Sequence, residues 1–314
     1  GELVAFPTET VYGLGADATS RAALTRLYDA KGRPPAHPVI VHLYDVEQID
    51  AWAAHVPDSA RRLAEALWPG PLTLILPKAP HVSLQVTGGQ DTVGLRIPSH
   101  PVARRLLQEF GGGIAAPSAN KFGRLSPTTA ADVAHDFAEE VSLTLDGGTC
   151  DVGIESTIVD CTSQRPRILR PGMITAQQIA ALAGALAAAQ TGVAPAAAQP
   201  TAPRVPGSLP AHYAPRTSCQ LVSASELQSR LDELVASGKK VCVLSFQERQ
   251  DTAPAWIVAP AEPARYAHEL YRSLRQLDRE GADIILVESV PPDNEWAGIA
   301  DRLKRASSGS NGNG

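Results

Sequence analysis

The sequence predicts an α/β protein built from two domains. Short runs of β-branched and apolar residues alternate with segments of helical periodicity in both halves of the chain. The 314 residues exceed the roughly 250–300 residues at which a single hydrophobic core stops growing. A stretch rich in Pro and Ala separates the two alternating regions. We therefore expect a first domain at residues 1–175, a helix and linker at 176–217, a second domain at 218–306 and a disordered tail at 307–314.

The first domain is expected to contain a mixed sheet with a helix after several of its strands. β-branched residues cluster at 3–6, 38–43, 72–77, 92–98, 113–118 and 156–160, which we interpret as strands. Apolar residues at helical spacing, with Ser, Asp or His near the start, predict helices at 20–32, 57–68 and 100–111. Joins without a helix, such as the one between 72–77 and 92–98, allow antiparallel pairing, so the sheet is expected to be mixed.

The connecting segment starts as an Ala-rich helix and then becomes rich in Pro and Ala. From Gly192 to Thr217 it has few large apolar residues, so one interpretation is a mobile spacer that buries little surface. Its last part, PGSLPAHYAP, favours a second interpretation. Prolines stiffen the backbone around His212 and Tyr213 and hold these side chains outward, so another part of the protein is expected to receive them.

The second domain is expected to be a small parallel βα domain of Rossmann-like type. Strands are predicted at 219–224, 239–246, 255–260 and 282–290, and helices at 264–281 and 296–307.

Charge and composition exclude several classes of protein. A net charge of −5 and a pI near 5.9 argue against a protein that coats nucleic acid, which needs clustered Lys and Arg. No apolar run approaches the roughly 20 residues of a membrane-spanning helix, so we expect no membrane association. Cys150, Cys161, Cys219 and Cys242 lack the spacing of a zinc site and are expected to be reduced core thiols of a cytoplasmic protein. The sequence starts at Gly1 rather than Met, and we expect a short native start to precede it.

The segment GLGADA, residues 13–18, loosely matches a glycine-rich dinucleotide-binding motif. The match is weak, because the expected helix N-cap, Thr19 or Ser20, follows the motif, and Arg33 stands near the position where an acid would bind ribose. We expect the glycines to let the chain turn tightly away from the strand at 3–6. No P-loop sequence is present in the chain.

Polar residues follow the first expected strand and the first expected helix. Thr8, Glu9 and Thr10 can orient a small polar substrate at a strand end or can satisfy the amides of a turn. Lys31 and Arg33 can form a phosphate clamp on a loop stiffened by prolines, or they can stabilise a helix C-terminus.

Two later segments combine small residues with hydroxyls. Residues 113–129 carry Ser118, Asn120 and Ser126, which suit either a nucleotide loop or an ordinary polar loop, and residues 145–160 form a glycine-rich turn before a strand. Arg96 and Arg170 lie in or beside apolar strands, so each needs an anionic partner, either a ligand or a salt bridge. His42 ends an expected strand and is the histidine best placed to face a site.

Taken together, these motifs resemble a known family. PTETVYGLGADA, AKGRP followed by PVIVHL, TVGLRIP, APSANKFGRLSPTT, GGTCDVGIESTIVD and LRPG occur in the order found in the YrdC-like domain of the threonylcarbamoyl-AMP synthase family. PGSLPAHYAP and the terminal βα region resemble the Sua-type branch of that family. The resemblance covers residues 2–306 and implies a YrdC-like domain with a twisted mixed sheet and a concave site, a linker and a small Rossmann-like domain.

The resemblance implies an adenylate-forming nucleotidyltransferase. L-Threonine, bicarbonate or CO2 and ATP with Mg²⁺ would give threonylcarbamoyl-AMP and pyrophosphate, and a tRNA threonylcarbamoyl transferase complex would use the product; we expect no tight tRNA binding. Lys31 and Arg33 would act in catalysis. The implied threonine site is Thr10, His42, Arg96, Ala116 and Ser156, and the implied ATP site is Lys31, Arg33, His37, Thr92, Ser118, Asn120, Ser126, Arg170 and Tyr213.

One departure and two rival functions accompany this resemblance. His37 stands where family members usually carry Asn, and a histidine there can titrate near neutral pH. The main rival function is a non-catalytic module that binds double-stranded RNA on a concave basic surface. A second rival is carbamoyl-phosphate-dependent hydrogenase maturation, for which the sequence lacks the expected additional zinc-finger and acylphosphatase segments.

Overall fold

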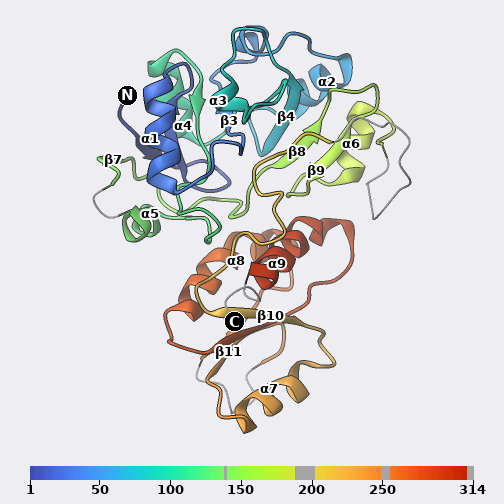
Figure 1. Cartoon of the computed structure of the whole chain (residues 1–314). Coiled ribbons are helices and arrows are strands. Elements are labelled where there is room, and N and C mark those ends of the chain that lie inside the picture. The colour runs from blue at the N-terminus through green and yellow to red at the C-terminus, as the bar shows by residue number, and fades with distance from the viewer. Residues whose placement is uncertain (138–139, 188–201, 249–254, 310–314) are drawn as a thin grey trace.

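The computed structural model describes residues 1–137, 140–187, 202–248 and 255–309, and Figure 1 shows them as two α/β domains joined by an extended segment. The first sheet contains β1 (Val4–Phe6), β2 (Gly13–Asp17), β3 (Ile40–His42), β4 (Leu72–Pro77), β5 (Thr92–Arg96), β6 (Ile114–Ala115), β7 (Leu143–Thr144), β8 (Thr157–Asp160) and β9 (Arg167–Arg170). Their spatial order is β7-β1-β2-β6-β3-β5-β4-β8-β9. β3 pairs with β5 in parallel whereas β4 and β5 pair antiparallel, which confirms the expected mixed sheet.

The helices of the first domain are α1 (Arg21–Lys31), α2 (Asp58–Leu67), α3 (Leu84–Thr87), α4 (Pro101–Phe110), α5 (Ala130–Phe137) and α6 (Ala176–Ala183), with a 3-10 turn, η1, at Val46–Ala51. Local sequence sets the ends of α1. The Ser20 hydroxyl accepts a hydrogen bond from the amide of Ala23, and Gly32 ends the helix with a left-handed φ of 60°. The amide of Arg33 then donates to the carbonyl of Tyr28 at 3.0 Å, which closes the turn at Gly32.

The glycines of residues 13–18 were expected to form the tight turn after the first strand, and the structure corrects this expectation. They do not form the turn after β1: Gly13 and Gly15 lie inside β2, which pairs antiparallel with β1. A Cβ on Gly15 would approach the Phe6 ring to 2.8 Å and a methyl of Ile114 to 3.0 Å, so close packing within the sheet requires glycine there. The turn itself falls at residues 7–12, which places Thr8 and Thr10 at the edge of the sheet.

The second domain has the expected parallel sheet. β10 (Ser218–Val222), β11 (Val241–Ser245), β12 (Ala255–Val258) and β13 (Ile284–Glu288) are arranged in the order β10-β13-β11-β12, and all their pairings are parallel. The helices are α7 (Leu227–Ala236), α8 (Pro263–Asp278) and α9 (Ala297–Gly309), with a 3-10 turn, η2, at Asn294–Trp296. Helix α9 extends to Gly309, which corrects the expected disordered tail for residues 307–309; residues 310–314 lie outside the described part.

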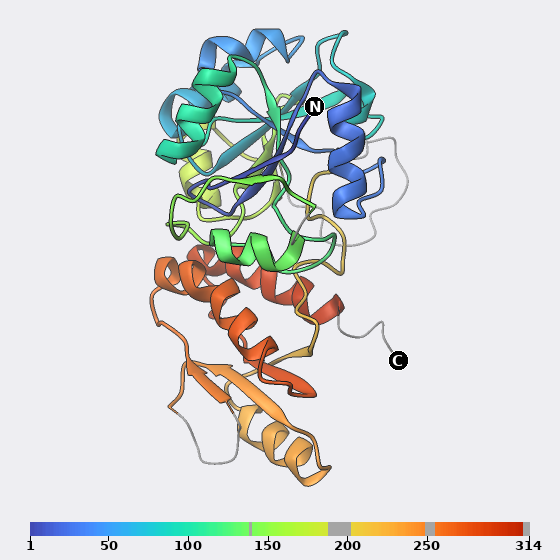
Figure 2. The ribbon, with the colours of Figure 1, turned by 90° about the vertical axis from the view of Figure 1, so that its left-hand side faces the viewer.

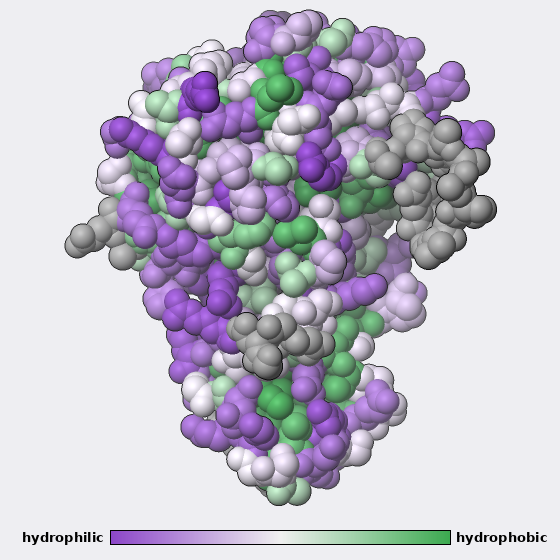
Figure 3. Space-filling model, in the orientation of Figure 1, coloured by the Kyte–Doolittle hydropathy of each residue, from purple (hydrophilic) through white to green (hydrophobic). Residues whose placement is uncertain are grey.

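The two domains meet through helices of the second domain. Figures 1 and 2 show α8 and α9 between the second sheet and the first domain, with α7 on the opposite face of that sheet. A common apolar cluster contains Ile154 of the first domain, Tyr213 of the linker and residues of α8 and α9 such as Leu270 and Ile299. Figure 3 shows a narrowing between the domains, with hydrophilic residues gathered on the side of α5 and α8.

The linker is packed against the protein where it is described. His212 and Tyr213 are 5% and 1% exposed, so at residues 202–217 the segment does not behave as a free spacer. This finding favours the interpretation in which other parts of the protein receive these side chains. Residues 192–201 of the predicted spacer lie outside the described ranges.

Candidate active site

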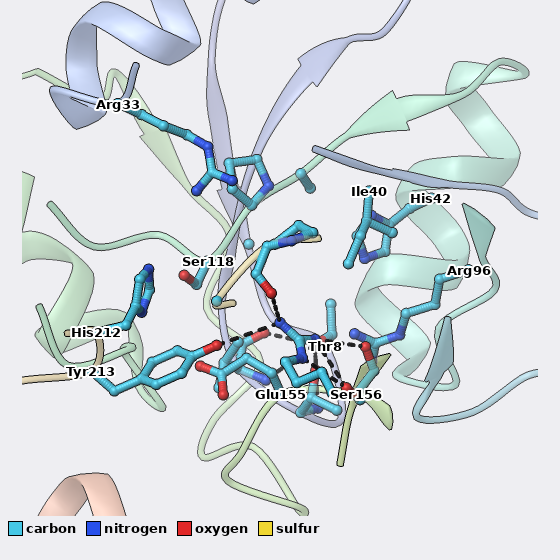
Figure 4. Close-up of a pocket in the computed structure, with 18 residues that line it drawn as sticks. Thr8, Arg33, Ile40, His42, Arg96, Ser118, Glu155, Ser156, His212 and Tyr213 are labelled. Atoms are coloured by element: carbon cyan, nitrogen blue, oxygen red, sulfur yellow. Dashed lines mark hydrogen bonds between the residues drawn. The ribbon is translucent and has the colours of Figure 1, made fainter. Parts of the chain in front are cut away.

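A cavity opens beside the first sheet where the ends of several strands meet the linker (Figure 4). The β1–β2 turn, the loop after α1, the ends of β3, β5 and β9, and the segments next to β6 and β8 all contribute to its wall. The residues that line it are Thr8, Thr10, Val11, Gly13, Arg33, Ile40, His42, Arg96, Ala116, Pro117, Ser118, Glu155, Ser156, Arg170, Pro206, Gly207, His212 and Tyr213. Its volume in this conformation is about 40 Å³, which suffices for a few water molecules.

Thr8 and Thr10 lie in the turn after β1, for which two roles were expected: satisfying the amides of the turn and orienting a substrate. The Thr8 hydroxyl donates to the carbonyl of Val11 at 2.6 Å and accepts the amides of Thr10 and Val11, both at 3.2 Å, so it holds the turn. The Thr10 hydroxyl lies 2.8 Å from the Thr8 hydroxyl and borders the cavity. Both threonines border the cavity, and the Thr8 hydroxyl orients that of Thr10.

Arg96 forms a buried ion pair at the end of β5. Its Nη2 lies 2.8 Å from Oε1 of Glu9, but the contact lacks the geometry of a hydrogen bond, and Nε has no hydrogen-bond partner among the described residues. The other oxygen of Glu9 accepts the amide of Ser99 at 3.1 Å. Arg96 is thus held by a carboxylate while N–H groups stay available for an anionic ligand.

His42 lies beside Arg96 on the cavity wall (Figure 4). Burial and the neighbouring Arg96 charge lower the pKa of His42 to about 3. The imidazole is therefore neutral near pH 7, and it adds a polar ring to the wall without adding a charge.

Arg33 and Arg170 bring two more guanidinium groups to the cavity. Nη2 of Arg33 donates to the carbonyl of Pro38 at 2.8 Å, which fixes the loop after α1. Nε and Nη2 of Arg170 donate to the carbonyl of Ser156 at 3.1 and 2.9 Å, and Nη1 donates to the carbonyl of Pro206 in the linker at 3.0 Å. Burial lowers the pKa of Arg33 to about 10, so this side chain stays charged at neutral pH.

Lys31 does not reach the cavity wall. Its Nζ donates to the carbonyl of Ser118 at 2.5 Å and to that of Asn120, and the side chain is 2% exposed. Burial, with a further contribution from Arg33, holds the pKa of Lys31 well below its ordinary value. Lys31 therefore ties the end of α1 to the loop after β6 rather than facing the open space.

Four other residues expected at the ATP site also lie off the cavity wall. The His37 ring packs edge-on against Phe122 with centroids 5.2 Å apart, and burial lowers its pKa. The Asn120 amide donates to the carbonyls of Lys121 and Arg124, whereas Thr92 lies at the start of β5, at the opposite end from Arg96.

Ser126 is the fourth residue of the expected ATP site that lies off the cavity wall, and it contacts the wall through Glu155. Its hydroxyl donates to Oε1 of Glu155 at 2.5 Å, and Glu155 lines the wall.

Sequence reasoning missed Glu155 as a site residue. It is buried, and it lines the cavity directly before Ser156. Burial alone would raise the pKa of its carboxyl group, but the Arg302 and Arg170 charges overcome this and lower it to about 2. Its position between a glycine-rich turn and a strand was the available signal. Its ion-pair partner, Arg302, lies 147 residues further along the sequence, and no local pattern connects the two residues.

The linker closes one side of the cavity with His212 and Tyr213, opposite His42 and Arg96 in Figure 4. The Tyr213 hydroxyl lies 3.5 Å from Nη1 of Arg170, which donates to it, and the backbone has a positive φ of 57°, rare for a bulky residue. Burial lowers the pKa of His212 to about 3, so this ring is neutral as well.

The cavity is suited to anionic ligands. Arg33, Arg96 and Arg170 face it together with several hydroxyls, and the one carboxylate in the wall, Glu155, is neutralised by arginine. In the described part of the chain no three His, Cys, Asp or Glu residues come close enough together to hold a metal ion. Nor does any helix there have the length and apolar character needed to cross a membrane.

The fold and the cavity thus define a two-domain α/β protein with an arginine-lined site beneath a linker. A family model described as "Telomere recombination" matches residues 1–172, and another, described as "Threonylcarbamoyl-AMP synthase, C-terminal domain", matches residues 174–308. The chain belongs to the threonylcarbamoyl-AMP synthase family. It is an enzyme, and its activity is that of a threonylcarbamoyl-AMP synthase.

Known proteins of this family are similar over nearly the whole chain. The threonylcarbamoyl-AMP synthases of Pyrococcus abyssi and Bacillus subtilis are 39% and 40% identical, over 98% of this chain and 91% and 90% of their own length. A crystal structure of P. abyssi Sua5 complexed with L-threonine has a TM-score of 0.89 and 38% identity, covering 98% of this chain and 91% of that one. The family and the enzyme class predicted from the motifs are confirmed.

Proposed function

We propose that the cavity binds L-threonine and ATP together and joins them through bicarbonate, giving threonylcarbamoyl-AMP and pyrophosphate. The convergence of Arg33, Arg96 and Arg170 on one enclosed space carries this proposal. The reaction brings a carboxylate, a carbamate and a triphosphate into contact, and fixed guanidinium groups are the donors that suit such anions best. The threonine complex of the P. abyssi relative supports the same assignment.

Threonine is proposed to bind on the Arg96 side of the cavity. All five residues expected there, Thr10, His42, Arg96, Ala116 and Ser156, border the same space. Arg96 would bind the carboxylate with N–H groups that Glu9 leaves unused. The hydroxyls of Thr10 and Ser156 would bind the polar groups of the substrate, and Ala116 is small enough to leave room for them.

ATP is proposed to bind toward Arg33, Ser118, Arg170 and Tyr213. Arg33 and Arg170 would bind the phosphates and stabilise the negative charge that develops as pyrophosphate leaves. We assign Lys31 a positioning role, because its ammonium group fixes the carbonyls of Ser118 and Asn120. Catalysis would then rest on orientation and charge stabilisation rather than on a protein nucleophile.

Access for ATP requires movement of the linker. A cavity of about 40 Å³ is far below the roughly 300 Å³ or more of a typical ligand pocket. Pro206, Gly207, His212 and Tyr213 are the wall residues that a linker movement would displace. We propose that the described conformation is closed and that the linker opens to admit substrates.

Mg²⁺ is proposed to enter as part of the ATP complex. The only carboxylate in the cavity wall is Glu155, whose oxygens already accept hydrogen bonds from Ser126, Tyr271 and Arg302. The phosphate oxygens of ATP would therefore supply most of the ligands of Mg²⁺. We further propose that the product passes to a tRNA threonylcarbamoyl transferase in the cytoplasm and that the enzyme binds no tRNA tightly.

Pyrophosphate release tests the proposed function. The purified protein with ATP, Mg²⁺ and bicarbonate is expected to release pyrophosphate when L-threonine is added and not when it is omitted. L-Serine is the matched control, since it lacks one methyl group. Equal release with serine, or no release with threonine, would contradict the proposal. Arg33→Ala is expected to abolish ATP binding, measured by calorimetry, without changing the thermal unfolding of the protein by more than a few degrees.

A further inference from the structure

Arg302 of α9 reaches from the second domain to Glu155, which lies in the wall of the cavity in the first domain. Its side chain is completely buried. Nε donates to Oε2 of Glu155 at 2.6 Å, Nη2 donates to the carbonyl of Glu155 at 3.1 Å, and Nη1 donates to the carbonyl of Pro171 at 2.9 Å. One guanidinium group thus holds both the side chain and the backbone of a cavity residue.

Tyr271 of α8 binds the same carboxylate. Its hydroxyl lies 3.0 Å from Oε2 and 3.2 Å from Oε1 of Glu155, to which it donates. The remaining side-chain donor to this carboxylate among the described residues is Ser126 of the first domain. Two of the three side chains that donate hydrogen bonds to Glu155 among the described residues therefore come from the second domain.

Glu155 in turn supports groups that face the substrates. Ser156 follows it directly, and the Ser156 carbonyl accepts two hydrogen bonds from Arg170. Arg170 then donates to the Tyr213 hydroxyl. A shift of residues 155–156 would therefore displace a guanidinium group and the linker tyrosine together.

Arg302 and Tyr271 also contact Tyr213 directly. The Arg302 guanidinium carbon lies 5.1 Å from the centroid of the Tyr213 ring, over its face, and the Tyr271 ring centroid lies 6.1 Å away. The same pair of side chains thus supports both Glu155 and the residue that closes the cavity.

The positive charge of Arg302 has a second effect, because it lies beside the negative charge of Glu155. A buried carboxylate without a cation would repel the phosphate and carboxylate groups of the substrates and would weaken the fields of Arg33 and Arg170. Arg302 lies 2.6 Å from Glu155 directly behind the wall, where it also pairs with Asp301 at 2.9 Å, and it compensates the Glu155 charge. The cavity then keeps the positive potential that its substrates require.

A second ion pair between the domains offers a comparison. Arg275 of α8 binds Asp136 of the first domain, with Nη2 at 2.8 Å from a carboxylate oxygen, and donates to the carbonyl of Leu125 at 2.7 Å. It joins the domains as Arg302 does and is nearly as buried, but neither Arg275 nor Asp136 lines the cavity. Domain docking alone therefore does not explain the placement of Arg302.

We propose that the second domain completes the active site by supplying Arg302 and Tyr271 as positioning residues, which hold Glu155 and Tyr213 and neutralise the carboxylate next to the substrates. The proposal rests on the proposed function for its kinetic consequences. It assigns the C-terminal domain a part in substrate binding and turnover, in addition to anchoring the linker.

Kinetics of matched variants test the proposal. Arg302→Met is expected to lower kcat/KM for ATP about 100-fold, with KM raised and kcat lowered, because it leaves an uncompensated buried carboxylate beside the phosphates. Arg302→Lys keeps the charge and should retain more activity, and Tyr271→Phe should cause a smaller loss of about 3–10-fold, equivalent to one hydrogen bond. Arg275→Met and Arg275→Lys are the controls and should stay within about 3-fold of the parent protein.

A double variant separates charge from packing. Replacing Glu155 by Gln in the Arg302→Met background removes the unpaired charge, so Arg302→Met/Glu155→Gln is expected to recover part of the lost ATP affinity. In Arg302→Met alone, activity should also rise as the pH is lowered, because protonation of Glu155 has the same effect. The titratable, charged and hydroxyl groups that face this carboxylate are Ser126, Arg170, His212, Tyr213, Tyr271 and Arg302.

Hydrogen–deuterium exchange gives a result that does not depend on turnover. Exchange at residues 155–156 and 206–213 should accelerate in folded Arg302→Met and Tyr271→Phe and stay unchanged in Arg275→Met. Absence of pyrophosphate release by the parent protein would refute the proposed function alone. Exchange and kinetics in the Arg302 and Tyr271 variants that match those of the Arg275 variants would refute the positioning role.

Discussion

Gly207 and Tyr213 fit together so closely that a Cβ atom on Gly207 would lie 1.8 Å from the Tyr213 hydroxyl. Gly207 also has a φ of +74°, so glycine is required there both by the backbone and by the contact. The tyrosine hydroxyl can approach Arg170 only because residue 207 has no side chain.

Gly207→Ala is expected to weaken closure of the linker. The added methyl group would push Tyr213 away from Arg170, and we expect kcat to fall about 10-fold or more in the pyrophosphate-release assay. Gly281→Ala is the control, since its φ is +63° and a Cβ there meets nothing within 4 Å. Both variants should lose similar stability from backbone strain. Equal activity in the two would show that the contact between Gly207 and Tyr213 does not matter for turnover.

Arg96→Lys is expected to weaken L-threonine binding by about 10–100-fold and to leave ATP binding nearly unchanged. A lysine keeps the charge but loses the forked donors that fit a carboxylate. Calorimetric titration with each substrate separately measures both affinities. A parallel loss for both substrates would contradict the assignment of this residue to threonine alone.

Lys31→Met is expected to lower ATP affinity about 10-fold, because the carbonyls of Ser118 and Asn120 lose their shared donor and the loop relaxes. Lys121→Met is a suitable comparison, since Lys121 donates to the carbonyl of Ala30 without lining the cavity. If Lys31→Met abolishes ATP binding as completely as Arg33→Ala, then Lys31 contacts the nucleotide directly.

Acid is expected to destabilise the protein from about pH 6.5 downward through His42 and His212. Burial lowers the pKa of each from 6.5 to about 3. Between these values the unfolded chain binds protons that the native protein does not. The free energy of unfolding therefore decreases as the pH is lowered, by up to about 1.4 kcal/mol per pH unit for each histidine. Urea unfolding at several pH values measures this slope, which His212→Gln should reduce.

Glu155 adds a second acid transition at lower pH. Its pKa is lowered from 4.5 to about 2, so its contribution to stability is present above pH 4.5 and is lost as the pH falls through about 2. Urea unfolding of Glu155→Gln should show this lower transition removed while the histidine slope remains. A slope near zero above pH 4.5 in the parent protein would contradict the histidine prediction.

The sequence was most informative where a residue's chemistry and its place at a strand end agreed. His42, Arg96 and Ser156 lie at or next to ends of β3, β5 and β8, and such ends meet at one edge of a sheet. The mixed sheet and the parallel second sheet followed from the alternation of apolar runs, and they are observed.

Side-chain direction could not be predicted in the same way. Lys31 and Arg33 are separated only by Gly32, yet the left-handed turn at this glycine sends one side chain to the loop carbonyls and the other to the cavity. The partnership of Glu155 with Arg302 depends on how two domains pack, and residue order contains no signal for it. The strand β2 was missed because glycine is usually unfavourable in strands, whereas here it allows close approach to Phe6.

The location of Arg302 in α9, well after the first domain in the sequence, has a consequence for synthesis on the ribosome. The first domain emerges early, and its sheet can form while the rest of the chain is still being made. Glu155 then lacks its arginine until α9 has left the exit tunnel. We therefore expect ribosome-bound chains, stalled before residue 297, to fold their first domain with Glu155 still lacking this arginine, so that the pairing forms only after α9 has been synthesised.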